Sequence, residues 1–243
     1  MNGVVRQQRG EVRRDAILRA TWDVILRDGV RGVRHRAVAA AANVPLSATT
    51  YYFKDIQDLL VQSFELFAEE SIERFAIPFW RQVEQQRLDF IEQRRAAERA
   101  GETYDDTLSN ELLLEVAANY IDVRLQQHRA QVELEYAFWY AAIQEPRLQV
   151  AVRQVIRRWI GLMLPWLALL PVSQPEQAAR SMLATMRRIE YEGLIEGSAT
   201  VSPHWIRDAV AYQLKGFGEG DGLSTSRILA DVTGRRMAPT LRG

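Results

Sequence analysis

The apolar residues between Arg13 and Asp28 recur with the spacing of a helix that buries one face. They stand at i, i+1, i+4, i+7 and i+8, and are Ile17, Leu18, Thr21 (through its methyl group), Val24 and Ile25. Gly29 follows directly. Because glycine adopts a positive φ without a Cβ clash, it predicts the end of this helix. A short loop then leads to a second helix over Arg36 to Ala42.

A tight corner interrupts the helical pattern at Asn43, Val44 and Pro45. Asparagine tolerates the left-handed conformation that ends a helix, and proline is compatible with the first turn of the next one. The third helix is therefore expected over Leu46 to Phe53. The alanines of the second helix allow the two short helices to approach closely, so this stretch predicts a helix-turn-helix.

The rest of the chain is also expected to be helical. Asp55 is a predicted N-cap for a fourth helix, with Asp58 in its first turn, and this helix should kink or break at Pro78. Further helical patterns start at Phe79 and then cover Leu112–Gln126, Ala130–Gln144, Pro146–Leu170, Pro175–Ile195 and a last helix from Ser202 to Gly216. We find no alternating strand pattern and no internal repeat, so the predicted fold is all-α.

Three parts are expected along the chain. Residues 1–55 form a three-helix, helix-turn-helix domain, and residues 56–216 form a larger helical domain. Residues 217–243 contain glycine, serine and arginine without a sustained period, which is typical of a poorly ordered tail.

Charge is distributed unevenly along a chain whose net charge is zero, with 31 basic and 31 acidic residues. Residues 1–55 contain ten Arg and Lys but five Asp and Glu, so the helix-turn-helix part carries +5 and the remainder −5. This basic part, residues 1–55, which we call the head, favours an anionic partner. The alternative interpretation is an ordinary solvated charged surface.

The sequence contains no cysteine, which excludes disulfides, thiolate metal sites and cysteine nucleophiles and fits a reducing cytoplasm. We expect no signal peptide, because the first residues lack an apolar segment. We also expect no membrane span, because the most apolar run, Trp159 to Val172, contains Pro165 and is shorter than the ~20 residues required.

Residues 13–60 resemble the DNA-binding domain of TetR-family transcriptional regulators. The resemblance rests on "ILRATWDVILRDGVRG", "RAVAAAANV" and "TYYFKDIQDLL", in that order and at the usual spacing. It covers about a fifth of the chain; the remainder resembles the family only in being long and helical. The resemblance implies a homodimeric repressor that binds a palindromic operator in double-stranded DNA and is released by a small-molecule effector.

The chain departs from the family pattern at four positions. Arg34 stands where a threonine often caps the second helix, Asn43 replaces the corner glycine, and Pro45 replaces a serine. Ile56 stands where a lysine is common, and Lys54 is expected to take over its phosphate contact.

The expected DNA-binding residues lie at the second and third helices and the junction that follows. Small hydroxyl-bearing side chains fit into a major groove, and hydroxyls, phenols and cations bond base edges and phosphates. For Tyr51 and Tyr52 a core role is an equal alternative, and for Phe53 the core is preferred. The predicted contacts are Arg34, His35, Arg36, Ser47, Ala48, Thr49, Thr50, Tyr51, Tyr52 and Lys54.

Two further sets of residues follow from the resemblance, and for both sets a simple core role remains open. Aromatic groups with polar handles are expected to line the effector cavity: Phe79, Trp80, Tyr120, Tyr136, Trp139 and Tyr140. Apolar residues of the last two long helices are expected to form the dimer interface: Trp159, Leu162, Met163, Leu183, Met186 and Leu194.

Two other classes of function are alternatives. An all-α enzyme is disfavoured, because the three histidines, His35, His128 and His204, are far apart in sequence and no Glu-x-x-His pair occurs. We therefore expect no metal and no cofactor. A helical adaptor that binds a protein partner instead of DNA is disfavoured by the basic head alone.

Overall fold

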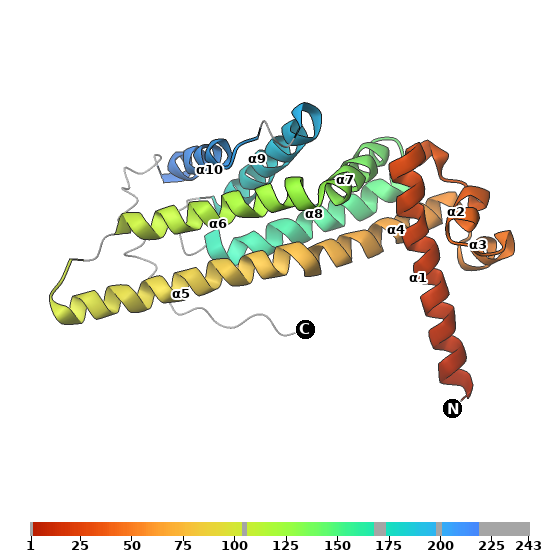
Figure 1. Ribbon diagram of the computed structural model, residues 1–243, viewed down its shortest axis with the longest axis horizontal. Helices are drawn as coiled ribbons and strands as arrows, with labels where there is room; N and C mark the ends of the chain where they lie inside the picture. The colour runs from red at the N-terminus through yellow and green to blue at the C-terminus, as the bar shows by residue number, and fades with distance from the viewer. Residues whose placement is uncertain (1, 104–105, 168–173, 198–200, 219–243) are drawn as a thin grey trace. The chain divides into compact units, whose positions relative to one another are not determined.

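The computed structural model describes residues 2–103, 106–167, 174–197 and 201–218. All regular structure in these ranges is helical, and they contain no strand (Figure 1). The predicted all-α fold is confirmed. None of the described helices is both long and apolar enough to cross a membrane.

The chain divides into two compact units. The first comprises Met1–Ala76 and His128–Ile156, and the second comprises Ile77–Gln127 and Arg157–Gly243. The first unit thus contains all of residues 1–55 and adds helices from two later parts of the chain. The predicted boundaries at residues 55 and 216 stay predictions, and the predicted tail, 217–243, lies almost wholly outside the described residues.

The first unit is built around the helix-turn-helix. Its elements are α1 (Asn2–Asp28), the 3₁₀ turn η1 (Val30–Gly32), α2 (His35–Ala41), α3 (Leu46–Tyr52), α4 (Ile56–Ser71), the π-helical turn η2 (Ile72–Ala76), α7 (Arg129–Ala142) and the first half of α8 (Pro146–Leu167). The five apolar positions predicted for the first helix are all buried, as is Phe53. In one core the four hydrocarbon side chains of this set and Phe53 join Val38 of α2, Phe64 of α4 and Phe138 of α7, so α7 helps to hold the first unit together.

Three predicted backbone signals are confirmed in this unit. Gly29 ends α1 with φ 71°, and Asn43 adopts a left-handed φ of 52° at the corner between α2 and α3. Asp55 is the N-cap of α4, where its Oδ1 accepts a 2.7 Å hydrogen bond from the backbone N–H of Asp58.

The expected irregularity at Pro78 is the π-helical turn that precedes it, Ile72–Ala76. Proline has no N–H to donate to the carbonyl of Arg74, four residues earlier, and its ring would clash with that carbonyl in a regular α-helix. A wider turn relieves this crowding while the chain stays helical.

The second unit contains α5 (Ile77–Ala100), α6 (Asp106–Gln127), the second half of α8, α9 (Pro175–Glu196) and α10 (Pro203–Gly218). One of its cores joins α6, α9 and α10 through Ile121, Leu125, Ile189 and Ile206. The predicted cap of the last helix is confirmed, because Ser202 Oγ accepts a hydrogen bond from the N–H of Trp205 at 3.2 Å.

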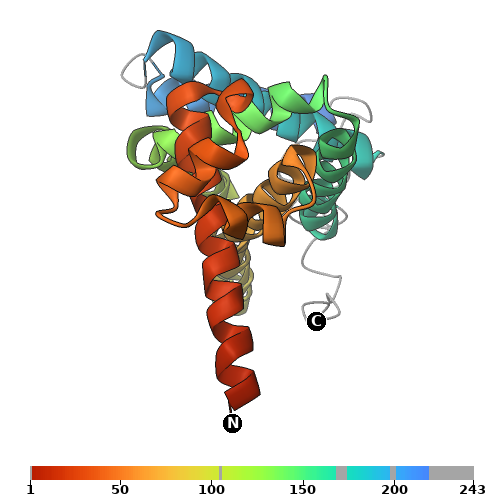
Figure 2. The ribbon, with the colours of Figure 1, turned by 90° about the vertical axis from the view of Figure 1, so that its right-hand side faces the viewer.

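One helix differs markedly from its predicted extent. The first helix begins at Asn2 rather than near Arg13, so its N-terminal part projects as a rod beyond α2 and α3 (Figure 2). Apolar periodicity detects helices that bury a face. From Gln8 to Ala16 no side chain is buried, so this part gave no periodic signal.

Candidate nucleic-acid interface

The corner between α2 and α3 is fixed by backbone hydrogen bonds. The N–H of Val44 bonds the carbonyl of Ala39 at 3.0 Å, and the N–H of Ala42 bonds the carbonyl of Val38 at 2.8 Å. Asn43 makes the reversal in its left-handed conformation, and Pro45 occupies the N-cap position of α3. These replacements of the family residues are compatible with the turn that positions α3.

One face of α3 is exposed. It consists of Leu46, Ser47, Thr50 and Tyr51, and the Tyr51 side chain has 81% of its surface accessible. Spacings of one, three and four residues place these side chains on one side of a helix. This face carries two hydroxyls and a phenol, the chemistry that bonds base edges and phosphates.

The opposite face of α3 belongs to the core, which corrects one predicted contact. Thr49 is fully buried, and its hydroxyl donates to the carbonyl of Leu46 at 2.8 Å. Thr49 is therefore a packing residue of the turn and not part of the exposed surface. Ala48 is half-buried against the core, so only part of its methyl group belongs to the exposed surface of α3.

Tyr52 supports the exposed face rather than extending it. Its half-buried ring packs against the core and meets the ring of Tyr51 edge-on, with centroids 5.0 Å apart. A Cβ placed on Gly10 would lie 3.7 Å from Tyr52 Oη, so this hydroxyl lies beside α1. Tyr52 is thus the more buried of the two tyrosines and Tyr51 the exposed one, and the contact of either with DNA stays a prediction.

Exposed cations stand at the start of α2 and after the end of α3. Arg34, Arg36 and Lys54 are exposed, and none of them has a carboxylate partner among the residues that the structure describes. Other arginines of the head are paired: Arg19 with Glu70, and Arg27 with Asp28. The positive charge next to α3 is therefore not neutralised by these ion pairs.

The structure gives the remaining head residues specific places. Arg34 is the N-cap of α2 and makes no side-chain capping bond. It therefore does not replace the hydrogen bond that a threonine would make at this position, and its side chain is exposed. The Nδ1 atom of His35 is buried and has no hydrogen-bond partner in the described part of the chain. The backbone N–H of Lys54 donates to Asp58 Oδ2 at 3.0 Å, which fixes Lys54 between α3 and α4.

The six predicted effector residues fall into two groups, one in each unit. Phe79 contacts both Tyr120 and Trp80 in the second unit, with ring centroids 4.6 and 5.0 Å apart. Tyr136, Trp139 and Tyr140 lie on α7 in the first unit. Trp139 packs against the core, whereas Tyr140 is exposed.

Half of the predicted dimer residues are buried within a single chain. Trp159, Met163 and Leu183 belong to the core, and Leu162, Met186 and Leu194 are half-buried. A side chain that already fills the core of one chain has no surface left for a second copy. For Trp159, Met163 and Leu183 the alternative of a core role is therefore the correct one.

A buried ion-pair cluster in the second unit was not predicted. Glu190 accepts hydrogen bonds from Arg124 Nε at 2.6 Å and from Arg187 Nη1 at 2.7 Å. Burial acts to raise the pKa of Glu190, but the two guanidinium groups outweigh it and hold the pKa below its ordinary value. Arg124 and Glu190 are 66 residues apart, so no local sequence pattern predicts their pairing.

A surface groove of about 330 Å³ lies between α9 and α10 in the same unit, and it too was missed. It contains none of the predicted effector residues. Its lining is Ser181, Ala184, Thr185, Arg188, Ile189, Trp205 and Ala209. In the described part of the chain, no group of three or more His, Asp or Glu residues is arranged to hold a metal.

Comparison with known proteins identifies the fold. No protein-family model matches the chain, and no curated protein does. A transcriptional regulator from Rhodococcus sp. Rha1 superposes with a TM-score of 0.63 at 16% identity, over 87% of this chain and 98% of that one. A member of the TetR family from Streptomyces coelicolor A3 gives 0.57 at 24% identity, over 83% and 97%.

A third solved structure, the multidrug binding protein EbrR complexed with imidazole, gives a TM-score of 0.55 at 22% identity, over 83% of this chain and 94% of EbrR. These identities are too low to carry function across, but the likeness extends over nearly the full length of each solved chain. The resemblance predicted from residues 13–60 is thus confirmed for the fold: the chain has the all-α fold of TetR-family transcriptional regulators.

Proposed function

We propose that the chain is a sequence-specific, DNA-binding transcriptional regulator of the TetR family. The observation that carries this proposal is the exposed face of α3, Leu46, Ser47, Thr50 and Tyr51. The start of α2 and the residue pair after α3 add exposed cations that lack carboxylate partners among the described residues. A helix of this kind fits the major groove, where hydroxyls and phenols reach base edges. Arg34, Arg36 and Lys54 would bind the phosphates on either side.

The regulator would act as a homodimer on a palindromic operator. Two copies related by a two-fold axis present their recognition helices to successive major grooves of one duplex face. Tyr191 and Ile195 of α9 are large apolar residues that stay exposed in the single chain. We place them in the dimer interface, in preference to the buried Trp159, Met163 and Leu183.

A small-molecule effector would relieve repression by binding a conformation that fits the operator poorly. EbrR, whose fold this chain shares, is a multidrug binding protein whose structures include complexes with ethidium and proflavin. By analogy we place an aromatic or apolar effector near Phe79 and Tyr120, whose rings pair in the second unit. A coupling of about 1–3 kcal/mol between effector and operator is the usual scale.

An adaptor that binds protein rather than DNA is the alternative. Binding to a protein partner does not require unpaired cations next to a helix that fits a major groove. We therefore prefer the DNA-binding function. Because operator DNA lies in the bacterial cytoplasm and the chain has no cysteine, we place its action there.

The test is a selection of bound sequences from a pool of random duplexes, followed by fluorescence polarisation with the selected duplex at fixed salt. We expect one palindromic sequence to be enriched and to bind at least a hundredfold more tightly than a scrambled duplex. Equal binding to the selected and the scrambled duplex would contradict sequence-specific recognition. A chain that ignores both would support the adaptor.

A further inference from the structure

The N-terminal part of α1, residues 2–16, is helical, and we call it the α1 arm. No side chain is buried from Gln8 to Ala16, and Ile17 is the first that is fully buried. Stability of a helix in a protein comes mostly from packing of an apolar face. A helical segment without such packing, from Gln8 to Ala16, raises the question of what else it contacts.

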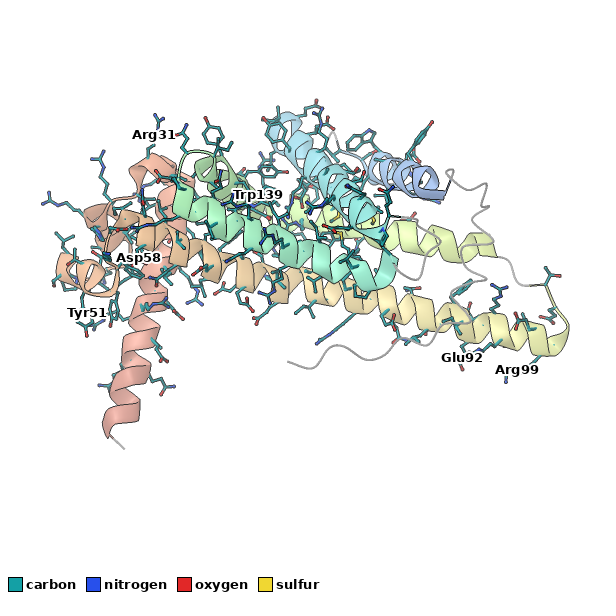
Figure 3. All side chains as sticks on the ribbon, turned by 180° about the vertical axis from the view of Figure 1, so that it is seen from behind. Arg31, Tyr51, Asp58, Glu92, Arg99 and Trp139 are labelled. Atoms are coloured by element: carbon teal, nitrogen blue, oxygen red, sulfur yellow. The ribbon has the colours of Figure 1, made fainter. Side chains whose placement is uncertain are left out.

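The arm lies beside the recognition helix. The position of Gly10 against Tyr52 Oη, 3.7 Å from where a Cβ would stand, places α1 next to the last turn of α3. At 1.5 Å per residue, the eight helical residues before Gly10 continue for about 12 Å past this point, which matches the width of a major groove. In Figure 3, Tyr51 lies on the side of the helix-turn-helix toward which the arm projects, and Arg31 lies on the opposite side.

Arg9 and Arg13 occupy one row of the arm. They are four residues apart, and the row continues through Ile17, Ala20 and Val24, which are buried in the head. Arg14 points elsewhere, because its guanidinium donates to Gln62 Oε1 of α4. The two arginines therefore continue the row that faces the helix-turn-helix core.

Nothing in the described chain neutralises this pair. Arg9 and Arg13 are exposed, and neither has a carboxylate partner among the described residues. Like charges four residues apart repel each other and destabilise a helix. An anionic partner alongside the arm would reverse that effect, and DNA on the Tyr51 side supplies one.

We propose that the α1 arm is a second DNA contact, in which the guanidinium groups of Arg9 and Arg13 bind backbone phosphates flanking the groove that α3 enters. This inference rests on the proposed DNA-binding function and adds residues that the predicted interface lacks. Arginine suits the role because its planar group bonds phosphate oxygens in pairs. Phosphate contacts fix register without reading sequence, so the arm would set affinity and footprint length rather than base preference.

The experiment compares full-length variants over a series of salt concentrations, on the selected duplex or, if none is selected, on a duplex of random sequence. Arg9→Gln/Arg13→Gln should weaken binding roughly tenfold per arginine, and the slope of log K against log salt should fall by about 1.8, or 0.9 for each phosphate. Hydroxyl-radical footprinting should show protection lost at the outer edges of the site. Arg31→Gln, an exposed arginine on the opposite side of the head (Figure 3), is the control for a general loss of charge.

Two variants at Gly10 separate arm geometry from charge. Gly10→Pro keeps both arginines but removes an N–H and breaks the helix at the arm, so it should lose most of the affinity that the double variant loses. Gly10→Ala favours the helix and has room, with its Cβ at ordinary contact distance from Tyr52, so it should bind at least as tightly as the wild type. Thermal unfolding checks that each variant keeps its head folded.

The outcomes distinguish this inference from the function on which it rests. If the double variant matches Arg31→Gln in affinity, salt slope and footprint while the wild type still selects a sequence, the arm is not a contact and the proposed function stands. If the wild type selects no sequence but the double variant still loses more binding than the control, the arm is a general DNA contact and the proposed function fails. If no duplex is bound, both fail.

Discussion

Arg147 Nη1 lies 3.0 Å from Asp55 Oδ2, and this ion pair joins the first turn of α8 to the N-cap of α4. The neighbouring residues repeat the link, because Gln57 Nε2 donates to Glu145 Oε2 at 2.9 Å. Asp55, which caps α4 shortly after α3 ends, is thus held from a part of the chain 92 residues away. Within the first unit, these two contacts connect the start of α8 to the start of α4.

This link predicts a pH dependence of stability. The pKa of Asp55 lies below its ordinary value of 3.8, first because the Asp58 N–H donates to the carboxylate and second because Arg147 does. A carboxyl group with a lowered pKa stabilises the fold above its ordinary pKa, and this contribution disappears as the pH falls through the lowered value. We expect the thermal midpoint of Asp55→Asn to change less than that of the wild type between about pH 5 and pH 2.

Arg147→Gln is the internal control for this measurement. It removes the ion pair but keeps the cap, which is the larger cause of the lowered pKa. Its pH profile should therefore lie between those of the wild type and Asp55→Asn. Identical profiles for the wild type and Asp55→Asn would contradict the assigned role of Asp55.

Tyr51 and Lys54 should each contribute to operator binding in the absence of effector. Tyr51→Ala removes the most exposed aromatic group of α3, and we expect a loss of about 1–2 kcal/mol, roughly tenfold in affinity. Lys54→Ala should weaken binding to all duplexes and reduce the salt slope by about 1. Polarisation with the selected duplex measures both effects.

Tyr140→Ala is the matched control for Tyr51. Tyr140 is another exposed tyrosine of the same unit, on α7, and its removal should leave operator affinity within twofold of the wild type. Equal losses for the two tyrosine variants would mean that truncation, and not position on α3, lowers affinity.

Two glycines should respond oppositely to alanine. A Cβ on Gly193 in α9 would lie 2.7 Å from Cδ1 of the buried Leu125, so we expect Gly193→Ala to destabilise the protein by about 1–3 kcal/mol through overpacking. Gly161 in α8 has no atom within 4 Å of a built Cβ, so Gly161→Ala should stabilise it by up to about 1 kcal/mol. Chemical denaturation measures both, and a shift in the same direction for both variants would contradict this account.

Most of the fold could be predicted from local sequence patterns. Helix periodicity, the glycine stop at Gly29, the left-handed Asn43 and the cap at Asp55 are properties of a few neighbouring residues, and all four appear in the structure as predicted. The α1 arm was missed for the complementary reason: from Gln8 to Ala16 it is helical without burying a side chain, so periodicity could not reveal it.

Long-range relationships could not be predicted from local patterns. The burial of Thr49 depends on which side of α3 meets the core, and the pairing of Asp55 with Arg147 joins residues 92 positions apart. For Trp159 an apolar helical row could not distinguish an interface from a core, because both bury the same kind of side chain.

The buried cluster around Glu190 makes the last prediction, for the second unit. Its carboxylate is 1% exposed and bonds two guanidinium groups, those of Arg124 and Arg187. Glu190→Gln keeps the shape but removes the negative charge opposite two buried cations, and we expect it to lower the free energy of unfolding by about 3 kcal/mol. Glu192→Gln makes the same change two residues later on α9, where Glu192 pairs with the exposed Arg188, and should cost less than about 1 kcal/mol. Urea denaturation of both variants tests the contrast, and a cost for Glu190→Gln no larger than that for Glu192→Gln would show that the cluster contributes little to stability.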